Sequence, residues 1–321
     1  MLTVRECSNL LSVSPMRIKQ IIQENGWKIS RSGKHKVSKI KVPSETVRNL
    51  LDHRGLKYNN PKVITIAAEK GGVGKTFLST NVAVMAAARG LKVCLIDIDP
   101  ESCSTNSLLP DNADYDDMKT MLEVFNNNID FNDVVIPSKY ENLYLIPCKP
   151  KARRVERTTA DRNPKKLISE KIASLKENFD LILFDLPPNF STLTASCYLA
   201  CELVIMPSFP NVYSLESVEL TMADIEEVAA EYDAEKPETK ILLNAFRSTE
   251  KASREVRHAL ESDFKEHLLP FEISKYQDVS NLINEGLSVL EASSKALPDL
   301  MALTDFILPL QEKTDDKKVI H

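Results

Sequence analysis

Continuous apolar runs alternate with helical segments along most of the chain after residue 62. Each run is short and bounded by polar turns, as expected of strands that are buried on both faces of a sheet. Helical segments separate most of the runs, including those at 77–89, 164–178, 191–200 and 212–231. We therefore predict an α/β fold with a doubly wound, mostly parallel sheet and helices on both faces. The predicted strands span 63–67, 92–96, 143–146, 181–184, 203–206 and 241–243.

The first 58 residues follow a different pattern. Residues 2–11 carry apolar side chains at helical spacing, and Ser14-Pro15 is a typical start for a second helix that Gly26 would end. Two short helices joined by a tight turn outline a helix-turn-helix. The basic stretch 28–41 resembles the wing of a winged helix, and a third helix is expected over 43–51.

These boundaries divide the chain into three parts. We predict a small winged helix-turn-helix domain over 1–58, a large α/β domain over 62–312 and a charged tail over 313–321. Gly, Asn and Pro cluster at 55–61, which predicts a linker between the two domains. A chain of 321 residues is long enough for two domains, each with its own core.

Charge is distributed unevenly along the chain. Residues 1–60 hold 12 Lys and Arg against 4 Asp and Glu, a net charge of +8, which leaves −13 for the rest of a chain whose total is −5. A basic end on an acidic body indicates either a nucleic-acid-binding surface or a solvated basic face. The six cysteines are scattered, and no signal peptide or membrane-spanning run is present, so we expect a cytoplasmic protein without disulfides.

A glycine-rich loop follows the first predicted strand of the large domain. Residues 70–76 have the sequence Lys-Gly-Gly-Val-Gly-Lys-Thr and precede an alanine-rich helix, which is the setting of a P-loop NTPase. Glycines allow backbone N–H groups to approach phosphates, and the helix N-terminus adds positive potential. Lys75 would neutralise phosphate charge and Thr76 would bind Mg²⁺. We expect ATP to contact Gly71, Gly72, Val73, Gly74, Lys75, Thr76 and Phe77.

Two carboxylate motifs come at the ends of predicted strands. Asp97-Ile98-Asp99-Pro100 follows one strand, and Asp185-Leu186-Pro187-Pro188 follows another. The carboxyl ends of parallel strands share one edge of the sheet, so both motifs should face the glycine-rich loop. One carboxylate is expected to act on the Mg²⁺ ion and another to orient the attacking water.

The segment 70–76 resembles the deviant Walker A loop of the ParA and MinD ATPases, and the resemblance extends over about 62–310. It implies an ATP-dependent homodimer in which Lys70 reaches the partner's nucleotide, with weak basal hydrolysis that depends on Lys70, Lys75 and Asp99. It implies that Asp99, Asp185 and Thr76 serve the metal and that Asn244 reads adenine. Two residues depart from the family pattern: Phe77 replaces a hydroxyl residue, and Glu101 replaces a glutamine.

The ParA branch implies DNA partition for a plasmid or another low-copy replicon. Its ATP-bound dimer binds nucleoid DNA without sequence preference, and a ParB-like centromere-binding partner stimulates hydrolysis. The non-specific surface is expected to include Arg247, Lys251, Arg254 and Arg257. The N-terminal domain would repress its own operon through Met16, Arg17, Lys19, Lys34 and Lys36, unless the helix pair binds protein instead.

Two other functions share this type of loop. A MinD-like membrane-positioning ATPase needs a basic amphipathic C-terminal helix, whereas 297–310 contains Asp299 and Asp305 and no Lys or Arg. We therefore expect no membrane partner. An iron–sulfur carrier needs paired cysteines at a dimer axis, and the single close pair, Cys197 and Cys201, lies in an apolar stretch.

Overall fold

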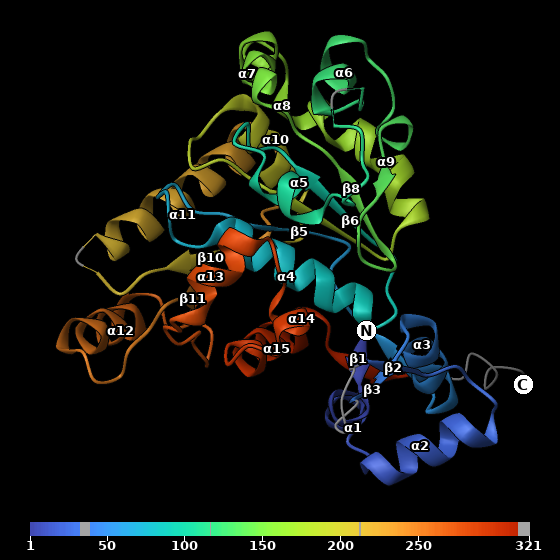
Figure 1. Ribbon diagram of the computed structural model, residues 1–321. Coiled ribbons are helices and arrows are strands. Elements are labelled where there is room, and N and C mark those ends of the chain that lie inside the picture. Colours follow the sequence, from blue (N-terminus) through green and yellow to red (C-terminus); the bar gives the residue numbers. More distant parts are fainter. Residues whose placement is uncertain (33–38, 116, 212, 314–321) are drawn as a thin grey trace, which may run out of the picture.

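The fold is built on a seven-stranded sheet (Figure 1), seen in a computed structural model that describes residues 1–32, 39–115, 117–211 and 213–313. The strand order is β11-β10-β5-β9-β6-β8-β7, and every pairing is parallel except that of β7 with β8. The predicted mostly parallel sheet is therefore confirmed. The strands are β5 (Val63–Ile66), β6 (Val93–Asp97), β7 (Ile136–Pro137), β8 (Leu143–Ile146), β9 (Leu181–Asp185), β10 (Leu203–Ser208) and β11 (Glu238–Leu243).

Alternate residues of each strand enter two separate cores, one on each face of the sheet. Ile64 and Ile66 of β5 point into one core, whereas Val63 points into the other. The first core is covered by α4 (Lys75–Ala88), α5 (Cys103–Leu108), α13 (Asp278–Glu285), α14 (Val289–Ala292) and α15 (Leu297–Ile307). The second is covered by α6 (Met121–Asn126), α7 (Arg153–Thr159), α8 (Pro164–Leu167), α9 (Ser169–Asn178), α10 (Thr192–Ala200), α11 (Ser214–Glu231) and α12 (Lys251–Asp263).

The N-terminal unit contains three helices and a small antiparallel sheet. Thr3 caps the first helix in a capping box with Glu6, and the Ser14 hydroxyl accepts a hydrogen bond from the Arg17 N–H at the start of the second. Two strands from the basic stretch pair antiparallel with each other, and one of them also pairs with the first strand; Lys34 and Lys36 lie outside the described residues. Its elements are β1 (Leu2–Thr3), α1 (Val4–Leu11), α2 (Pro15–Glu24), β2 (Ser30–Ser32), β3 (Lys39–Val42) and α3 (Ser44–His53).

Part of the predicted linker is ordered structure, because three of its residues form an interdomain contact. Residues 56–58 make strand β4 (Leu56–Tyr58), which pairs antiparallel with β12 (Leu310–Glu312) near the end of the chain. Each strand has three residues and the two are about 250 positions apart in the sequence, so no local pattern identifies the pair. The Tyr58 hydroxyl also donates a hydrogen bond to the Arg89 carbonyl, 3.3 Å away, at the end of α4.

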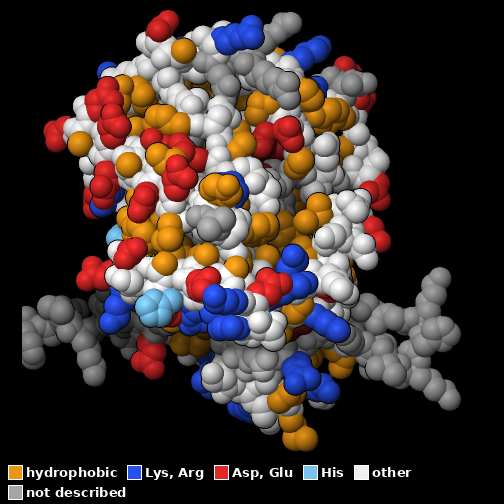
Figure 2. Space-filling model, turned by 90° about the vertical axis from the view of Figure 1, so that its left-hand side faces the viewer, with side chains coloured by type: hydrophobic (Ala, Val, Ile, Leu, Met, Phe, Trp, Pro, Cys, Tyr) orange, Lys and Arg blue, Asp and Glu red, His pale blue; other side chains and the backbone are white. Residues whose placement is uncertain are grey.

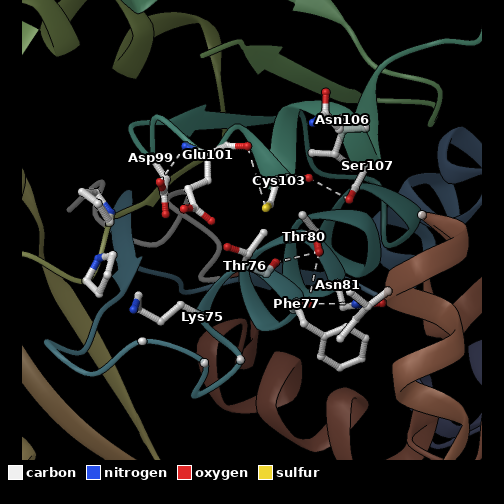
Figure 3. Close-up of a pocket in the computed structure, with 18 of the residues that line it drawn as sticks. Lys75, Thr76, Phe77, Thr80, Asn81, Asp99, Glu101, Cys103, Asn106 and Ser107 are labelled. Atoms are coloured by element: carbon white, nitrogen blue, oxygen red, sulfur yellow. Dashed lines mark hydrogen bonds between the residues drawn. The ribbon is translucent and has the colours of Figure 1, made fainter. Parts of the chain in front are cut away.

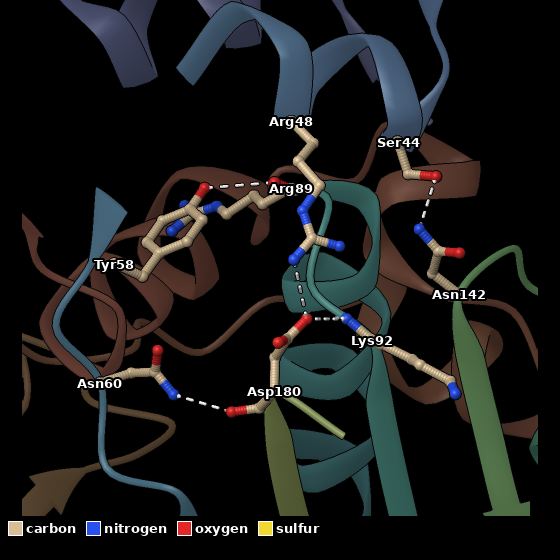
Figure 4. Close-up of polar contacts among 8 residues, drawn as sticks. All are labelled: Ser44, Arg48, Tyr58, Asn60, Arg89, Lys92, Asn142 and Asp180. Atoms are coloured by element: carbon tan, nitrogen blue, oxygen red, sulfur yellow. Dashed lines mark hydrogen bonds and ion pairs between the residues drawn. The ribbon is translucent and has the colours of Figure 1, made fainter. Parts of the chain in front are cut away.

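Polar contacts continue along this junction (Figure 4), and a shared apolar core accompanies them. The Arg48 guanidinium lies 3.6 Å from the Asp180 carboxylate, and Asn142 donates a hydrogen bond to the Ser44 hydroxyl. One contiguous cluster of buried apolar side chains runs from α1–α3 into the core beneath α4 and α15. Deleting residues 1–60 would expose that shared core and leave β12 without its partner strand. Functions of the N-terminal unit are therefore better tested by point substitutions.

Candidate nucleotide-binding site

The glycine-rich loop joins β5 to α4 and adopts a conformation that needs glycine. Gly72 and Gly74 have φ angles of +75° and +89°, which only glycine adopts readily. At Gly74, a Cβ atom would lie 2.6 Å from the Asn244 amide nitrogen. That amide donates a 2.8 Å hydrogen bond to the Val73 carbonyl, so it braces the loop from the end of β11.

Lys75 begins α4 and its side chain is almost buried, with 7% exposed. Its ammonium donates to the Lys70 carbonyl at 3.1 Å, so the side chain folds back along the loop. Burial lowers the pKa of Lys75, and the carboxylates of Asp185 and Asp99 partly oppose this effect. A desolvated ammonium with one carbonyl partner inside a glycine-rich loop is suited to an anionic ligand.

Asp185, at the end of β9, is completely buried, and neither of its oxygens has a hydrogen-bond partner among the described residues. Burial and the nearby Asp97 carboxyl raise the pKa of Asp185 to about 7, while the Thr76 and Ser104 hydroxyls, which lie close by without forming a hydrogen bond, oppose the rise. A buried carboxylate without donors is costly unless a ligand satisfies it. Together with the Thr76 hydroxyl it forms an oxygen donor set of the kind that Mg²⁺ prefers, so these residues fit the metal.

Asp97 has a different environment from Asp185. Its carboxylate accepts hydrogen bonds from the Thr105 N–H at 2.9 Å, the Thr105 hydroxyl at 2.6 Å and the Asp99 N–H at 3.0 Å. Burial raises the pKa of Asp97 to about 6, and the two Thr105 bonds oppose the rise. Asp97 therefore anchors α5 and orients Asp99, whose own carboxylate lines the cavity.

A cavity of about 1010 Å³ opens above the loop and is large enough for a nucleotide. Thr76 and Phe77 of α4 border it on one side, and Asp99 and Glu101 lie across from them (Figure 3). Arg157 of α7 also lines this cavity, although no sequence motif marked it. The structure thus brings the predicted phosphate and metal residues to one edge of the sheet.

Asn81 of α4, which the sequence did not single out, connects the α4 side of the cavity to the C-terminal helices. Its side chain is 2% exposed, donates to the Phe77 carbonyl at 2.8 Å and accepts from the Val289 N–H at 2.8 Å. The start of α14 is therefore tied to the first turns of α4. A buried Asn on a helix has no sequence signature, so only the fold reveals this connection.

Lys70 is not among the residues that line the cavity of its own chain. Its ammonium donates to the Asn211 side-chain oxygen at 2.9 Å and lies 5.4 Å from the centre of the Tyr213 ring, in the loop between β10 and α11. The structure contains one chain, so the predicted contact with a partner's nucleotide stays a prediction. The predicted contact of Asn244 with adenine also stays a prediction, beside its observed contact with Val73.

The four basic residues predicted to contact DNA around α12 lie near one another, but acidic neighbours partly neutralise them. Arg247 pairs with Glu250, and Lys251 pairs with Glu255. Arg257 pairs with both Glu261 and Glu272, which leaves Arg254 as the member without an acidic partner among the described residues.

On the N-terminal unit, the predicted DNA-contacting residues of α2 are accessible. Met16 is 79% exposed and Lys19 is exposed, while Arg17 lies 3.6 Å from Glu24 of the same helix.

Figure 2 shows that most Lys and Arg side chains on the face that includes α12 lie in its lower half. The upper half of that face carries many Asp and Glu side chains.

Comparison with known proteins identifies the family. Residues 61–238 match the AAA_31 family, described as an AAA domain. The chain belongs to this family. It is 28% identical to the cell division protein PomZ of Myxococcus xanthus over 75% of this chain and 76% of that protein.

Two solved structures share the fold of this AAA_31 protein. The ATP complex of a McdA variant from Cyanothece has a TM-score of 0.69 and 18% identity, covering 77% of this chain and 95% of that one. A putative plasmid partition protein from Borrelia burgdorferi, bound to AMPPNP, has a TM-score of 0.63 and 20% identity, covering 76% and 99%.

Among the helices of the described segments, none combines the length and apolar character needed to cross a bilayer.

Proposed function

We propose that this protein is a ParA-type partition ATPase that hydrolyses ATP to ADP and phosphate with Mg²⁺. The observation that carries this proposal is the buried, unpartnered Asp185 carboxylate beside Thr76 and Lys75, at the mouth of a loop built on positive-φ glycines. The proposal is also supported by the AAA_31 match and by the nucleotides named for the two structural relatives.

Each site residue has a role that follows from its position. The N–H groups of the loop would hold the phosphates, and Thr76 and Asp185 would hold the metal, which supplies positive charge when bound. Asp99 lines the cavity across from Thr76, where a carboxylate would orient the attacking water. Lys75 would neutralise phosphate charge from its own chain, and Lys70 would do so from a second copy in an ATP-dependent homodimer.

In this proposal, the cargo that the protein partitions is DNA. The plasmid partition relative and the cell division relative support a role in positioning a cellular cargo. We infer that the protein acts in the cytoplasm, where its ATP-bound dimer contacts nucleoid DNA without sequence preference. The contacts would come from Arg247, Lys251, Arg254 and Arg257. A ParB-like partner would stimulate hydrolysis. Because acidic side chains offset three of these cations, Arg254 should contribute most among them.

The N-terminal unit would act as a winged helix-turn-helix repressor of its own operon. Its exposed α2 residues, Met16, Arg17 and Lys19, have the position of recognition-helix residues near the helix N-terminus. Lys34 and Lys36 remain part of the proposal on sequence grounds.

Gel shifts with the apo, ADP-bound and ATP-bound protein test both DNA roles. The probes are random DNA and DNA from upstream of the gene, at two salt concentrations. ATP-dependent binding to random DNA that is lost in Lys70→Ala supports partition, and nucleotide-tolerant binding to upstream DNA that is lost in Arg17→Ala supports repression. Binding to neither DNA in any nucleotide state would contradict both roles.

The membrane-positioning alternative gains no support from the structure. The apolar side chains Leu300, Leu303 and Ile307 of α15 are fully buried in the core with α4, so this face is not available to lipid. Liposome flotation with ATP is expected to show no binding. Cys197 and Cys201 are likewise both buried, which gives no exposed thiol pair for an iron–sulfur cluster.

A further inference from the structure

A second large cleft lies where the N-terminal unit meets the C-terminal helices. Its volume is about 960 Å³, close to that of the nucleotide cavity. One wall comes from α1, from Lys19 of α2 and from Ile40 of β3. The opposite wall comes from residues 293–305, which include the connection between α14 and α15. Neither the ATPase chemistry nor the predicted DNA contacts around α12 use this cleft.

The charges lining this cleft do not balance. Of its two acidic side chains, Asp305 is neutralised by its ion pair with Arg89 at 2.7 Å, whereas Glu6 accepts a hydrogen bond from the Thr3 N–H and keeps its negative charge. By contrast, Arg5, Lys19 and Lys295 are all exposed, and no carboxylate forms an ion pair with them in the described part of the chain.

Asp278 is the acid that faces Lys295 most directly. Its carboxylate accepts hydrogen bonds from the Ser294 hydroxyl at 2.8 Å and from the Lys295 backbone N–H at 3.4 Å. These two donors and the charge of Lys295 lower the pKa of Asp278. Asp278 therefore stays ionised and offsets one cation. With Asp305 neutralised by Arg89, the three cations of the cleft face the charges of Glu6 and Asp278, which leaves an excess of one positive charge.

The cations come from separate elements that the fold holds in fixed relative positions. Arg5 belongs to α1 and Lys19 to α2, whereas Lys295 belongs to the ATPase body. The β4–β12 pairing, the Arg48–Asp180 pair and the shared apolar core fix the two units against each other. Lys19, a predicted DNA-contacting residue of α2, lines this cleft as well, so the cleft and the predicted DNA-contacting surface of α2 share a residue.

We propose that the ATPase body is part of the operator-binding surface, with Arg5 and Lys295 contacting phosphates of a duplex whose bases are read by α2. This inference rests on the proposed repressor role of the N-terminal unit. Duplex DNA is the favoured occupant because the excess charge is positive, lies on both sides of the junction and includes a residue of α2. An acidic protein segment would be attracted by the same cations, but it would leave the position of these cations beside a predicted DNA-contacting helix unexplained.

The test uses the full-length protein and fluorescence anisotropy with upstream DNA over a range of salt concentrations. Each phosphate contact contributes about 0.9 to the slope of log affinity against log salt. We expect Lys295→Ala and Arg5→Ala each to weaken binding about three- to tenfold at low salt and to reduce the slope by about 0.9. Lys295→Arg should bind nearly as the wild type does, and the ATPase rate should not change in any of these variants.

Lys166→Ala is the matched control, because Lys166 is an exposed lysine on α8, on the opposite side of the molecule (Figure 1). An unchanged salt slope in both cleft variants would overturn the inference and leave the cleft to an acidic protein segment. A loss confined to random DNA in the ATP state would also overturn it. If the wild type does not prefer upstream DNA and Arg17→Ala has no effect, the repressor role itself fails, which is a different result.

Discussion

Gly74→Ala tests the geometry of the phosphate loop more directly than any charge substitution. The methyl group would enter at a φ of +89°, which costs an L-residue about 1–2 kcal/mol. It would also lie 2.6 Å from the Asn244 amide nitrogen, so that side chain must move. Moving it breaks a buried hydrogen bond to the Val73 carbonyl, at a cost of about 1–3 kcal/mol.

The two terms together predict a loss of about 2–5 kcal/mol in the free energy of unfolding. At about 2 °C per kcal/mol, the low end of the range for domains of about 150–250 residues, this corresponds to a fall in Tm of roughly 4–10 °C. Gly71→Ala is the matched control in the same loop, because its Cβ would meet no atom within 4 Å. Its Tm should stay close to that of the wild type.

Denaturant unfolding of a double-mutant cycle separates the two terms. Asn244→Ala alone removes the hydrogen bond to Val73, and Gly74→Ala in that background adds only the backbone strain. The free energy of unfolding of the double variant should therefore lie within about 0.5 kcal/mol of that of Gly74→Ala alone. Additive losses, or a Gly74→Ala protein with wild-type stability and ATP affinity, would refute this reasoning.

Two further predictions concern groups outside the loop. Arg89 is 1% exposed, and its one carboxylate partner among the described residues is Asp305 at 2.7 Å. Asp305→Ala should therefore lower the free energy of unfolding, measured with urea, by about 2–4 kcal/mol. Adding Arg89→Met should recover most of that loss, and no recovery would argue against an uncompensated buried charge. Burial and the neighbouring Glu69 carboxyl raise the pKa of Asp224 to about 7. The folded state then holds an extra proton between about pH 4 and 7, so wild-type stability should fall across that window as pH rises. Asp224→Asn should reduce this fall. If the variant and the wild type show the same dependence of stability on pH, the fall does not come from Asp224.

The sheet was predictable because strands buried on both faces leave continuous apolar runs. The β4–β12 pair was not predictable, since each strand has three residues and the pairing depends on how the whole chain folds back. The same holds for Asn81, whose buried bond with the Val289 N–H joins elements more than 200 residues apart. Local sequence therefore identified the buried strands of the large sheet, whereas long-range packing decided how the N-terminal unit attaches.

In the candidate site, too, some features were predictable from local sequence and others depended on the fold. The spacing of glycines and lysines predicted a loop at 70–76, because few backbone conformations allow N–H groups to converge on phosphate. Strand ends predicted that Asp99 and Asp185 lie near it. The distinction between Asp97, which is hydrogen-bonded to Thr105, and Asp185, which has no donor among the described residues, depends on neighbours that only the fold brings together.

Isothermal titration calorimetry with ATP, with and without Mg²⁺, tests the central claim most directly. The account predicts saturable ATP binding by the wild type that is stronger with Mg²⁺. It predicts that Lys75→Ala loses most of this binding, while Asp185→Asn loses the Mg²⁺ dependence and remains folded. Absence of binding by a folded wild-type protein, or equal binding by wild type and Lys75→Ala, would contradict the account.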